Sequence, residues 1–169
     1  MKSLETERST LRPITEEDAE FILELLNDPS FIQNIGDRQV RTLDGAKTYI
    51  SNTAIASYNK NGFGLLLVEL KETGEALGMC GLIRRNTLSD VDIGYAFLPR
   101  YWSKGYALES ARAMKEKARE AFGLERLVAI VDPNNASSIR LLEKLGMEFE
   151  KMVRLAEDDI ELKLYAVDL

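Results

Sequence analysis

Histidine is absent from the 169-residue sequence, and cysteine occurs only once, as Cys80. Without an imidazole, proton transfer near neutral pH has to use a carboxylate or an ordered water chain. A single cysteine cannot form an internal disulfide, and no apolar run approaches the roughly 20 residues that span a bilayer. Residues 1–13 also lack the apolar core of a signal peptide. We therefore expect a cytoplasmic protein with no membrane segment.

Blocks of one charge are also lacking, although 28 acidic residues outnumber 22 basic ones and give a net charge of −6. An acidic chain does not favour the phosphate backbone of nucleic acids, so we expect no nucleic-acid partner. A local basic pocket would still hold one small anionic ligand. The composition, 45% hydrophobic and 30% charged, is typical of globular proteins, and the length fits one domain over residues 1–169.

Hydrophobic periodicity divides the chain into alternating strands and helices. The clearest helix is 15–28, because Thr15 and Asp18 have capping-box spacing, apolar residues follow at helical intervals, and Pro29 stops the pattern. The predicted strands are 9–14, 63–70, 75–85, 91–99, 124–133, 149–155 and 160–169, and the predicted helices are 15–28, 42–58, 105–121 and 136–146.

The order of these elements predicts a mixed α/β domain with a long antiparallel part. A helix joins the strands at 91–98 and 126–131, so we expect two parallel neighbours with a right-handed crossover. That connection does not begin with G-x-G-x-x-G, which argues against dinucleotide binding. The last two strands form a hairpin around the turn AEDD, residues 156–159.

Two stretches resemble the GNAT acetyltransferase superfamily. The longer is DIGYAFLPRYWSKGYALESARAMKEKAREAFGLERLVAIVDPNNASSIRLLEKLGM, residues 92–147, and the shorter is ERSTLRPITEEDAEFILELLND, residues 7–28. Both are similar to the branch that contains ribosomal-protein N-terminal acetyltransferases. The resemblance implies a central, mostly antiparallel sheet with one splayed parallel strand pair and flanking helices. It also implies acetyl-coenzyme A as the acetyl donor.

Within the longer stretch, WSKGYA resembles the family's pyrophosphate loop, in which Gln or Arg is followed by two residues, Gly, one residue, and Gly or Ala. Trp102 takes the first place, as is common in this branch, and Ser103 stands where the branch often has glycine. A helix start offers unpaired N–H groups to phosphate, and glycine removes a Cβ from their approach. The alternative is an ordinary strand-to-helix turn. The residues predicted to bind coenzyme A here are Trp102, Ser103, Lys104, Gly105, Tyr106 and Ala107.

The resemblance also predicts contacts to the pantetheine arm of coenzyme A. Phe97 and Leu98 lie where the family pairs its splayed strand with the pantetheine amides and the thioester carbonyl, and Pro99 ends that strand. Asn135 and Ser138 match a second coenzyme A element at the start of the last helix. The alternatives are a core strand ended by proline and simple capping of a helix by Asn and Ser.

Acetyl transfer to an amine requires a group that removes a proton from the amine. With no histidine, Asp92 and Glu69 are the candidate bases. Asp92 begins the strand that carries the thioester site, and the branch often has an acidic residue at this place. The alternative for Asp92 is a solvated strand end.

A donor for the departing thiolate is less obvious. Many GNAT enzymes use a tyrosine in the last helix, but Leu142 stands at that place. Ser138 or Ser137 is the candidate donor, and a thiolate whose conjugate acid has a pKa near ~8.5 also leaves without one. An acetyl-cysteine mechanism is rejected, because Cys80 lies in an apolar strand without a histidine or a cluster of cations beside it.

The resulting prediction is an acetyl-coenzyme A-dependent N-acetyltransferase that works by direct transfer, without a metal. The acceptor is a primary amine on a protein N-terminus or on a small molecule such as a polyamine, an amino acid or an aminoglycoside-like antibiotic. Its pocket is expected between the first two helices, the connection 28–40 and the final hairpin. The alternatives are a non-catalytic acyl-coenzyme A binding or sensing domain and a structural interaction domain. Both a monomer and a homodimer are compatible with the sequence.

Overall fold

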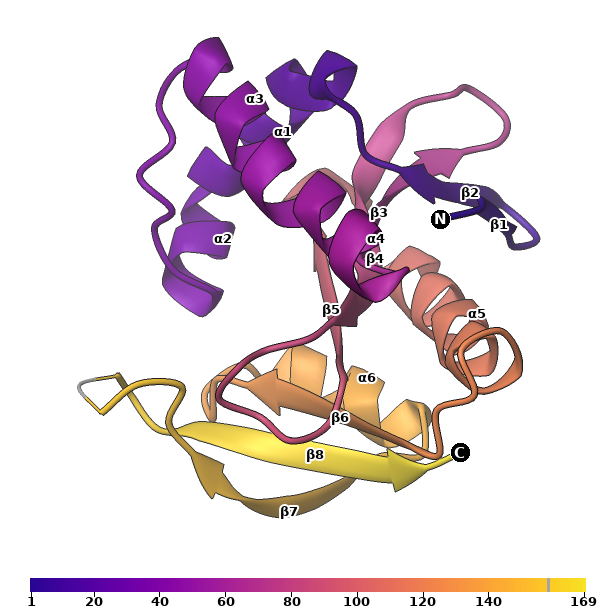
Figure 1. Ribbon diagram of the computed structural model, residues 1–169, viewed down its shortest axis with the longest axis vertical. Helices are drawn as coiled ribbons and strands as arrows, with labels where there is room; N and C mark the ends of the chain where they lie inside the picture. The colour runs from indigo at the N-terminus through magenta and orange to yellow at the C-terminus, as the bar shows by residue number, and fades with distance from the viewer. Residues whose placement is uncertain (158) are drawn as a thin grey trace.

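In the computed structural model, which describes residues 1–157 and 159–169, eight strands form one sheet in the order β1-β2-β3-β4-β5-β6-β8-β7 (Figure 1). All neighbouring strands are antiparallel except β5 and β6, which are parallel. The strands are β1 (Leu4–Glu5), β2 (Ser9–Pro13), β3 (Leu65–Leu70), β4 (Ala76–Ile83), β5 (Asp92–Phe97), β6 (Arg126–Val131), β7 (Glu148–Val153) and β8 (Leu162–Asp168).

Helical segments of three kinds surround the sheet. The α-helices are α1 (Ala19–Asn27), α2 (Pro29–Asn34), α3 (Leu43–Ile50), α4 (Ala56–Asn61), α5 (Tyr106–Glu120) and α6 (Ala136–Lys144). A π-helical segment, η2 (Ser51–Ile55), joins α3 to α4, and two short 3₁₀ segments are η1 (Glu16–Asp18) and η3 (Pro99–Tyr101). No helix in the described part of the chain is long and apolar enough to cross a membrane.

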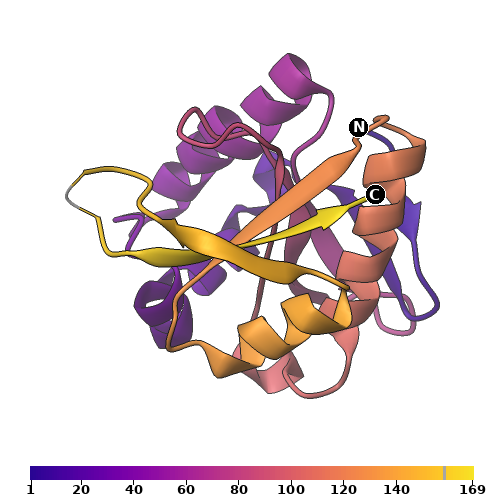
Figure 2. The same cartoon turned by 90° about the horizontal axis from the view of Figure 1, so that it is seen from below.

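The helices cover both faces of the sheet, as the view in Figure 2 shows, with α5 on one side of the central strands and α3 on the other. One apolar cluster joins α5 and α6 to residues such as Ile93 and Phe97 of β5. The second cluster joins α1 and α3 to Ala96 of β5 and to Leu98. Since side chains alternate along a strand, β5 faces a different helical layer with each successive residue.

The predicted mixed α/β class, the antiparallel meander and the parallel pair are confirmed. Two short elements were missed. The pair β1–β2 adds a two-residue edge strand, and α2 occupies part of the segment predicted as a connection. Pro29 does not only stop α1: it is also the first residue of α2, with Asp28 as the N-cap, because proline fits the first turn of a helix. The predicted turn 156–159 includes residue 158, which lies outside the described residues.

Strand β5 is paired very differently along its two edges. Six residue pairs join it to β4, from Gly78 with Phe97 to Ile83 with Asp92. A single pair, Asp92 with Val128, joins it to β6, where the amide of Val128 donates to the carbonyl of Val91 at 3.1 Å. Beyond this point the two parallel strands separate, which places a gap in the middle of the sheet.

Candidate active site

The predicted phosphate loop forms the start of α5 with a backbone that leaves its amides open. Gly105 is the N-cap residue at φ 84°, and no side chain among the described residues caps the helix there. Ser103 also has a positive φ, 60°, although it is not glycine. The first amides of a helix have no acceptor within the helix, so the N–H groups of Tyr106 and Ala107 are free to bind an anion. Both residues line the main cavity, together with Gly105, Ser103 and Trp102.

Arg8 holds the phosphate loop in place, although the sequence did not indicate this residue. Its Nη1 donates to the carbonyl of Lys104 at 2.9 Å, and its Nε pairs with Glu109 of α5 at 2.9 Å. The guanidinium also lies over the ring of Tyr106, 4.4 Å from its centroid. Lys104 itself is exposed and is not among the cavity-lining residues. The tip of the β1–β2 hairpin therefore supports the loop in a fixed shape.

The backbone of β5 presents the amides of Tyr95 and Phe97 to the gap, whereas Phe97 and Leu98 were predicted. The amide of Leu98 donates to the carbonyl of Leu77 in β4 at 3.1 Å, so it is already paired inside the sheet. By alternation, the N–H groups of Tyr95 and Phe97 point to the other edge, toward the gap. The indole of Trp102 donates to the carbonyl of Phe97 at 2.8 Å. Phe97 thus lines the cavity as predicted, whereas Leu98 does not.

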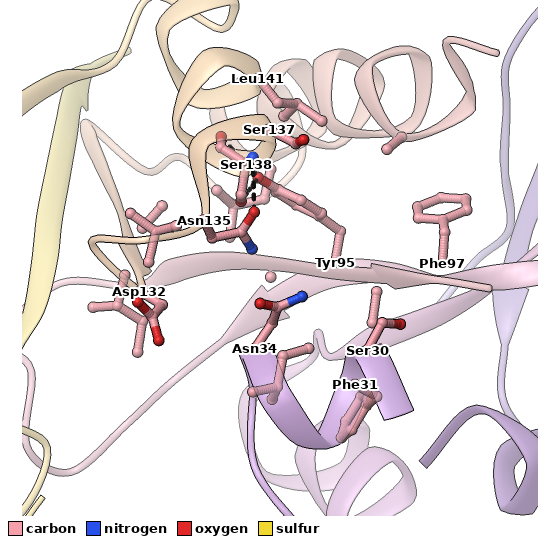
Figure 3. A pocket seen from close by; sticks show the side chains of 18 of the residues that line it. Ser30, Phe31, Asn34, Tyr95, Phe97, Asp132, Asn135, Ser137, Ser138 and Leu141 are labelled. Carbon is pink, nitrogen blue, oxygen red and sulfur yellow. Dashed lines mark hydrogen bonds between the residues drawn. The ribbon is translucent and has the colours of Figure 1, made fainter. Parts of the chain in front are cut away.

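Across the gap, the first turn of α6 brings Asn135 and Ser138 to the cavity (Figure 3). Asn135 caps the helix, with Oδ1 accepting from the amide of Ser138 at 3.2 Å. The hydroxyl of Ser138 lies 2.5 Å from that of Tyr95, whose side chain extends from β5 to α6 in Figure 3. Burial raises the pKa of Tyr95 to about 12, so this phenol is neutral in the native protein.

Asp92 is buried, with only 2% of its side chain exposed, so the alternative of a solvated strand end is wrong. Its Oδ2 accepts from Nε of Arg85 at 2.6 Å, and both side chains line the cavity. Burial raises the pKa of Asp92, and the positive charge of Arg85 opposes that effect. Asp92 is on the face of β5 that carries Ala96, which packs against α1 and α3, while Tyr95 is on the other face.

The structure does not bring Glu69, the second predicted base, to this cavity. Glu69 is in β3, which β4 separates from β5, and it forms an ion pair with Arg12. Arg12 also pairs with Asp18 at 2.7 Å. These contacts tie β2 and β3 to the start of α1. The geometry therefore assigns Glu69 a role in holding the N-terminal elements together.

Two further predictions concern residues in the core. Cys80 is fully buried in β4, and burial raises the pKa of its thiol to about 12, so a thiolate does not form there near neutral pH. This supports the rejection of an acetyl-cysteine mechanism. Leu142, which stands at the place of the family's tyrosine, is 1% exposed and packs in the core. Its side chain has no polar hydrogen to donate.

The cavity that joins these groups has a volume of about 1040 Å³ and runs from the start of α5 to α2 and the β7–β8 connection. Its lining includes residues 30–36 of the segment 28–40, which was predicted to bind the acceptor, and Ile160 of the final hairpin. Although the whole chain is acidic, the described cavity lining contains four basic and three acidic side chains, which are Arg38, Arg85, Arg140, Lys144, Asp92, Asp132 and Asp159. The site is therefore locally more basic than the protein.

Comparison with known proteins identifies the family. A sequence model described as an acetyltransferase (GNAT) domain matches residues 8–148. The chain belongs to the GNAT acetyltransferase family. This GNAT protein is 30% identical to the uncharacterized N-acetyltransferase YoaA of Bacillus subtilis (strain 168) over 153 residues, which are 89% of this chain and 85% of YoaA. It is 39% identical to the uncharacterized protein YkkB of the same organism over 100 residues, which are 57% of this chain and only 58% of YkkB.

Solved acetyltransferase structures share the fold of this GNAT protein along nearly its whole length. An acetyltransferase from Agrobacterium tumefaciens str. C58 superposes with a TM-score of 0.84 at 26% identity, covering 99% of this chain and 94% of the other. The ribosomal L7/L12 α-N-protein acetyltransferase RimL, solved in complex with coenzyme A, superposes with a TM-score of 0.86 at 15% identity, covering 99% and 98%. At that identity the likeness concerns the fold alone.

The residues present fit coenzyme A as the donor ligand. An uncapped helix start with two positive-φ residues before it suits a pyrophosphate, and the free edge of β5 suits the amides of a pantetheine arm. The gap between β5 and β6 gives such an arm a path between Phe97 and Ser138. Gly105 has φ 84°, a backbone conformation that favours glycine, and a Cβ there would also lie 3.1 Å from Nη2 of Arg8.

Several features of this site were missed from the sequence. Tyr95 was predicted only as part of a core strand, Arg8 was not singled out, and the hydrogen bond from Trp102 was not anticipated. Arg8 meets Lys104 across 96 positions and Tyr95 meets Ser138 across 43, distances at which no local pattern operates. The one usable signal was the alternation in β5, which places Tyr95 and Phe97 on the same face.

Proposed function

We propose that this protein is an acetyl-coenzyme A-dependent N-acetyltransferase that transfers the acetyl group directly to a primary amine. The observation that carries the proposal is the free edge of β5, which opens into one cavity with the uncapped start of α5 at one end and buried Asp92 on the other face. Donor and acceptor sites thus meet at one strand, as direct transfer requires. The cytoplasmic location, the absence of a metal and the oligomeric state stay predictions.

On the donor side, acetyl-coenzyme A would supply an acetyl thioester. The amides of Tyr106 and Ala107 would hold its pyrophosphate, with Arg8 keeping the loop in shape. The gap-facing amides of Tyr95 and Phe97 would pair with the pantetheine arm and donate to the oxyanion that forms during transfer. Ser138 of α6, whose hydroxyl lies beside that of Tyr95 in the cavity, is the candidate donor to the sulfur.

On the acceptor side, the amine has to lose a proton as its nitrogen attacks the thioester carbon. A new C–N bond forms while the C–S bond breaks, and the thiolate leaves. Asp92 takes the proton, since Arg85 engages only its Oδ2 and leaves Oδ1 to accept it. The raised pKa of Asp92 makes it a better base than an exposed aspartate, because its affinity for the proton is higher.

The acceptor would enter through α2 and the final hairpin. Three exposed apolar side chains, Ile32, Ile35 and Ile160, line this part of the cavity, and Asn34 and Ser30 point toward β5 from α2 in Figure 3. A protein N-terminus and a small-molecule amine both fit this description. We keep both as acceptor classes, because the lining mixes apolar, basic and acidic side chains.

A release assay tests the function. Free thiol is measured after mixing the protein and acetyl-coenzyme A with peptides of varied N-terminal residue, polyamines, amino acids and aminoglycosides, and calorimetry measures donor binding in parallel. We expect micromolar-range donor binding and amine-dependent thiol release with one class. Donor binding without release for any amine would indicate an acyl-coenzyme A sensing domain, and no donor binding would refute the site itself.

A further inference from the structure

The hydroxyl groups of Tyr95 and Ser138 form a hydrogen bond across the gap. Among the described cavity-lining residues of β5 and α6, it is the one polar contact between side chains that crosses the gap. The two hydroxyl oxygens are 2.5 Å apart, and both side chains line the cavity. Tyr95 is on the face of β5 that packs with α5 and α6, and it lies past the single residue pair at which β6 is joined to β5. Figure 3 shows the ring extending from β5 to the first turn of α6.

We propose, on the basis of the function proposed above, that Tyr95 is a positioning residue that fixes the hydroxyl of Ser138 so that Ser138 points its hydrogen at the sulfur of the departing coenzyme A thiolate. The serine hydroxyl, held by the phenol, would then provide the O–H that Leu142 cannot provide. The donor to the sulfur is Ser138 of α6, positioned by Tyr95 of β5, and not a tyrosine of the last helix.

The direction of the hydrogen bond follows from the chemistry of the two groups. A phenol is the more acidic hydroxyl and an alkyl hydroxyl oxygen is the better acceptor, so Tyr95 donates to Oγ of Ser138. The carbonyl of Ser138 is a poorer partner for the phenol, at 3.4 Å. With its oxygen accepting from Tyr95, Ser138 keeps its own hydrogen for the cavity. Hydrogen bonds in such a chain strengthen one another, which makes Ser138 a better donor.

Tyr95 itself does not deliver a proton. Its pKa of about 12 lies roughly three to four units above that of a free thiol near ~8.5, so transfer from the phenol to a thiolate runs uphill. The phenol therefore stays protonated, and the thiolate is stabilised by the hydrogen bond from Ser138 alone. No bond to hydrogen is broken in this step.

The test is the pKa of the coenzyme A thiol when it is bound to the protein. Thiolate absorbance is followed as pH rises from 5 to 9, with desulfo-coenzyme A as the blank, so that protein absorbance cancels. Cys80 does not interfere, because its pKa is raised to about 12. We expect the bound thiol to titrate below free coenzyme A, and both Tyr95→Phe and Ser138→Ala to raise its pKa by about half a unit to one unit.

The variant that combines Tyr95→Phe with Ser138→Ala shows whether Tyr95 acts through Ser138 or acts on the thiolate independently. If Tyr95 acts through Ser138, then Tyr95→Phe adds nothing to Ser138→Ala, whereas independent contributions would add. The turnover number should follow the same pattern, falling by about tenfold in each single variant, with the dissociation constant of acetyl-coenzyme A within twofold of the wild-type value. Tyr165→Phe is the matched control, since this buried tyrosine of β8 is not among the cavity-lining residues.

An unchanged thiol pKa in Tyr95→Phe, or additive effects in the double variant, would overturn the positioning role even if acetyl transfer is intact. Failure of coenzyme A to bind at all would instead refute the proposed function.

If Tyr95→Phe unfolds, 3-fluorotyrosine in place of Tyr95 keeps the ring and makes the phenol a stronger hydrogen-bond donor. The bound thiol pKa should then fall, and a rise or no change would contradict the proposal.

Discussion

The two edges of β5 are made of the same residues and have opposite roles. The edge toward β4 is closed by six residue pairs, and close backbone contact there excludes even a methyl group. The edge toward β6 has one pair, at Asp92, and then opens into the cavity. A strand normally satisfies its amides on both sides. In this protein most of the second set has no partner in β6, and the proposed function assigns these amides to the donor. The edge toward β4 therefore holds the fold, and the edge toward β6 is the one proposed to bind the ligand.

The largest effect is expected on the closed edge. A Cβ built on Gly78 meets the carbonyl oxygen of Ala96 at 2.3 Å and Cα of Phe97 at 2.8 Å, and both are backbone atoms that cannot turn away. Gly78→Ala should therefore lower the free energy of unfolding by about 3 kcal/mol or more. Chemical denaturation with urea measures it.

The matched control for that change is Gly74→Ala in the β3–β4 turn. Gly74 has φ 77°, and a Cβ added there would meet no atom of the described residues within 4 Å. Only the backbone conformation is then strained, at a cost of about 1 kcal/mol. Equal losses in the two variants would contradict the tight packing of the closed edge.

The next effect concerns Asp92, which is paired with Ile83 of β4 on one edge of β5 and with Val128 of β6 on the other. Asp92→Asn keeps an oxygen that accepts from Arg85 but removes the base, so the turnover number should fall by about 10- to 1,000-fold. The dissociation constant of acetyl-coenzyme A should stay nearly unchanged. Glu69→Gln is the control, because its partner is Arg12 outside the cavity, and it should affect stability more than rate. Full activity of Asp92→Asn with its true acceptor would transfer the base role to water.

The proposed role of Asp92 as the base predicts that the rate depends on pH. A base works only when deprotonated, so the rate falls as pH drops through the pKa of Asp92 in the native protein. Burial raises that pKa above the ordinary aspartate value of 3.8, so the acid limb should lie above pH 3.8. In Asp92→Asn this limb should disappear from the pH profile of kcat/KM. A limb that persists unchanged in the variant would belong to another group.

The smallest effects are expected in the phosphate loop. Gly105→Val is the natural test from the sequence, but φ 84° and the contact with Arg8 mean that valine would also strain the fold. Ser103→Gly is the matched control within the loop, because φ 60° suits glycine. Ser103→Gly should change the free energy of unfolding by less than about 1 kcal/mol and leave the affinity for acetyl-coenzyme A unchanged.

Gly105→Ala, by contrast, should weaken the affinity for acetyl-coenzyme A. Calorimetric titration of both variants measures this affinity.

Most of the fold was predictable because each long element has its own hydrophobic period. The two missed elements, β1 and α2, are two and six residues long and too short to show one. Pro29 added to the difficulty, since proline is equally typical of the end of one helix and the start of the next.

The site was predictable where its residues are contiguous and not where they are joined by tertiary contacts. The loop 102–107 and the start of α6 both follow a local pattern, and most of these residues line the cavity. The burial of Asp92 depends on Arg85 and on packing between layers, so the sequence left a solvated strand end open as the alternative to a catalytic base. The amide of Leu98 is paired with β4 and does not face the gap, because strand register decides which amides do.

Amide hydrogen exchange along β5, resolved by residue with NMR, tests the central claim most directly. The claim is that the β6-facing edge receives the donor while the β4-facing edge belongs to the fold. Adding coenzyme A should slow exchange at Tyr95 and Phe97 by about tenfold or more, and should leave the already protected amides of Ala96 and Leu98 nearly unchanged. Equal slowing at all four amides, or none at Tyr95 and Phe97 with coenzyme A bound, would contradict it.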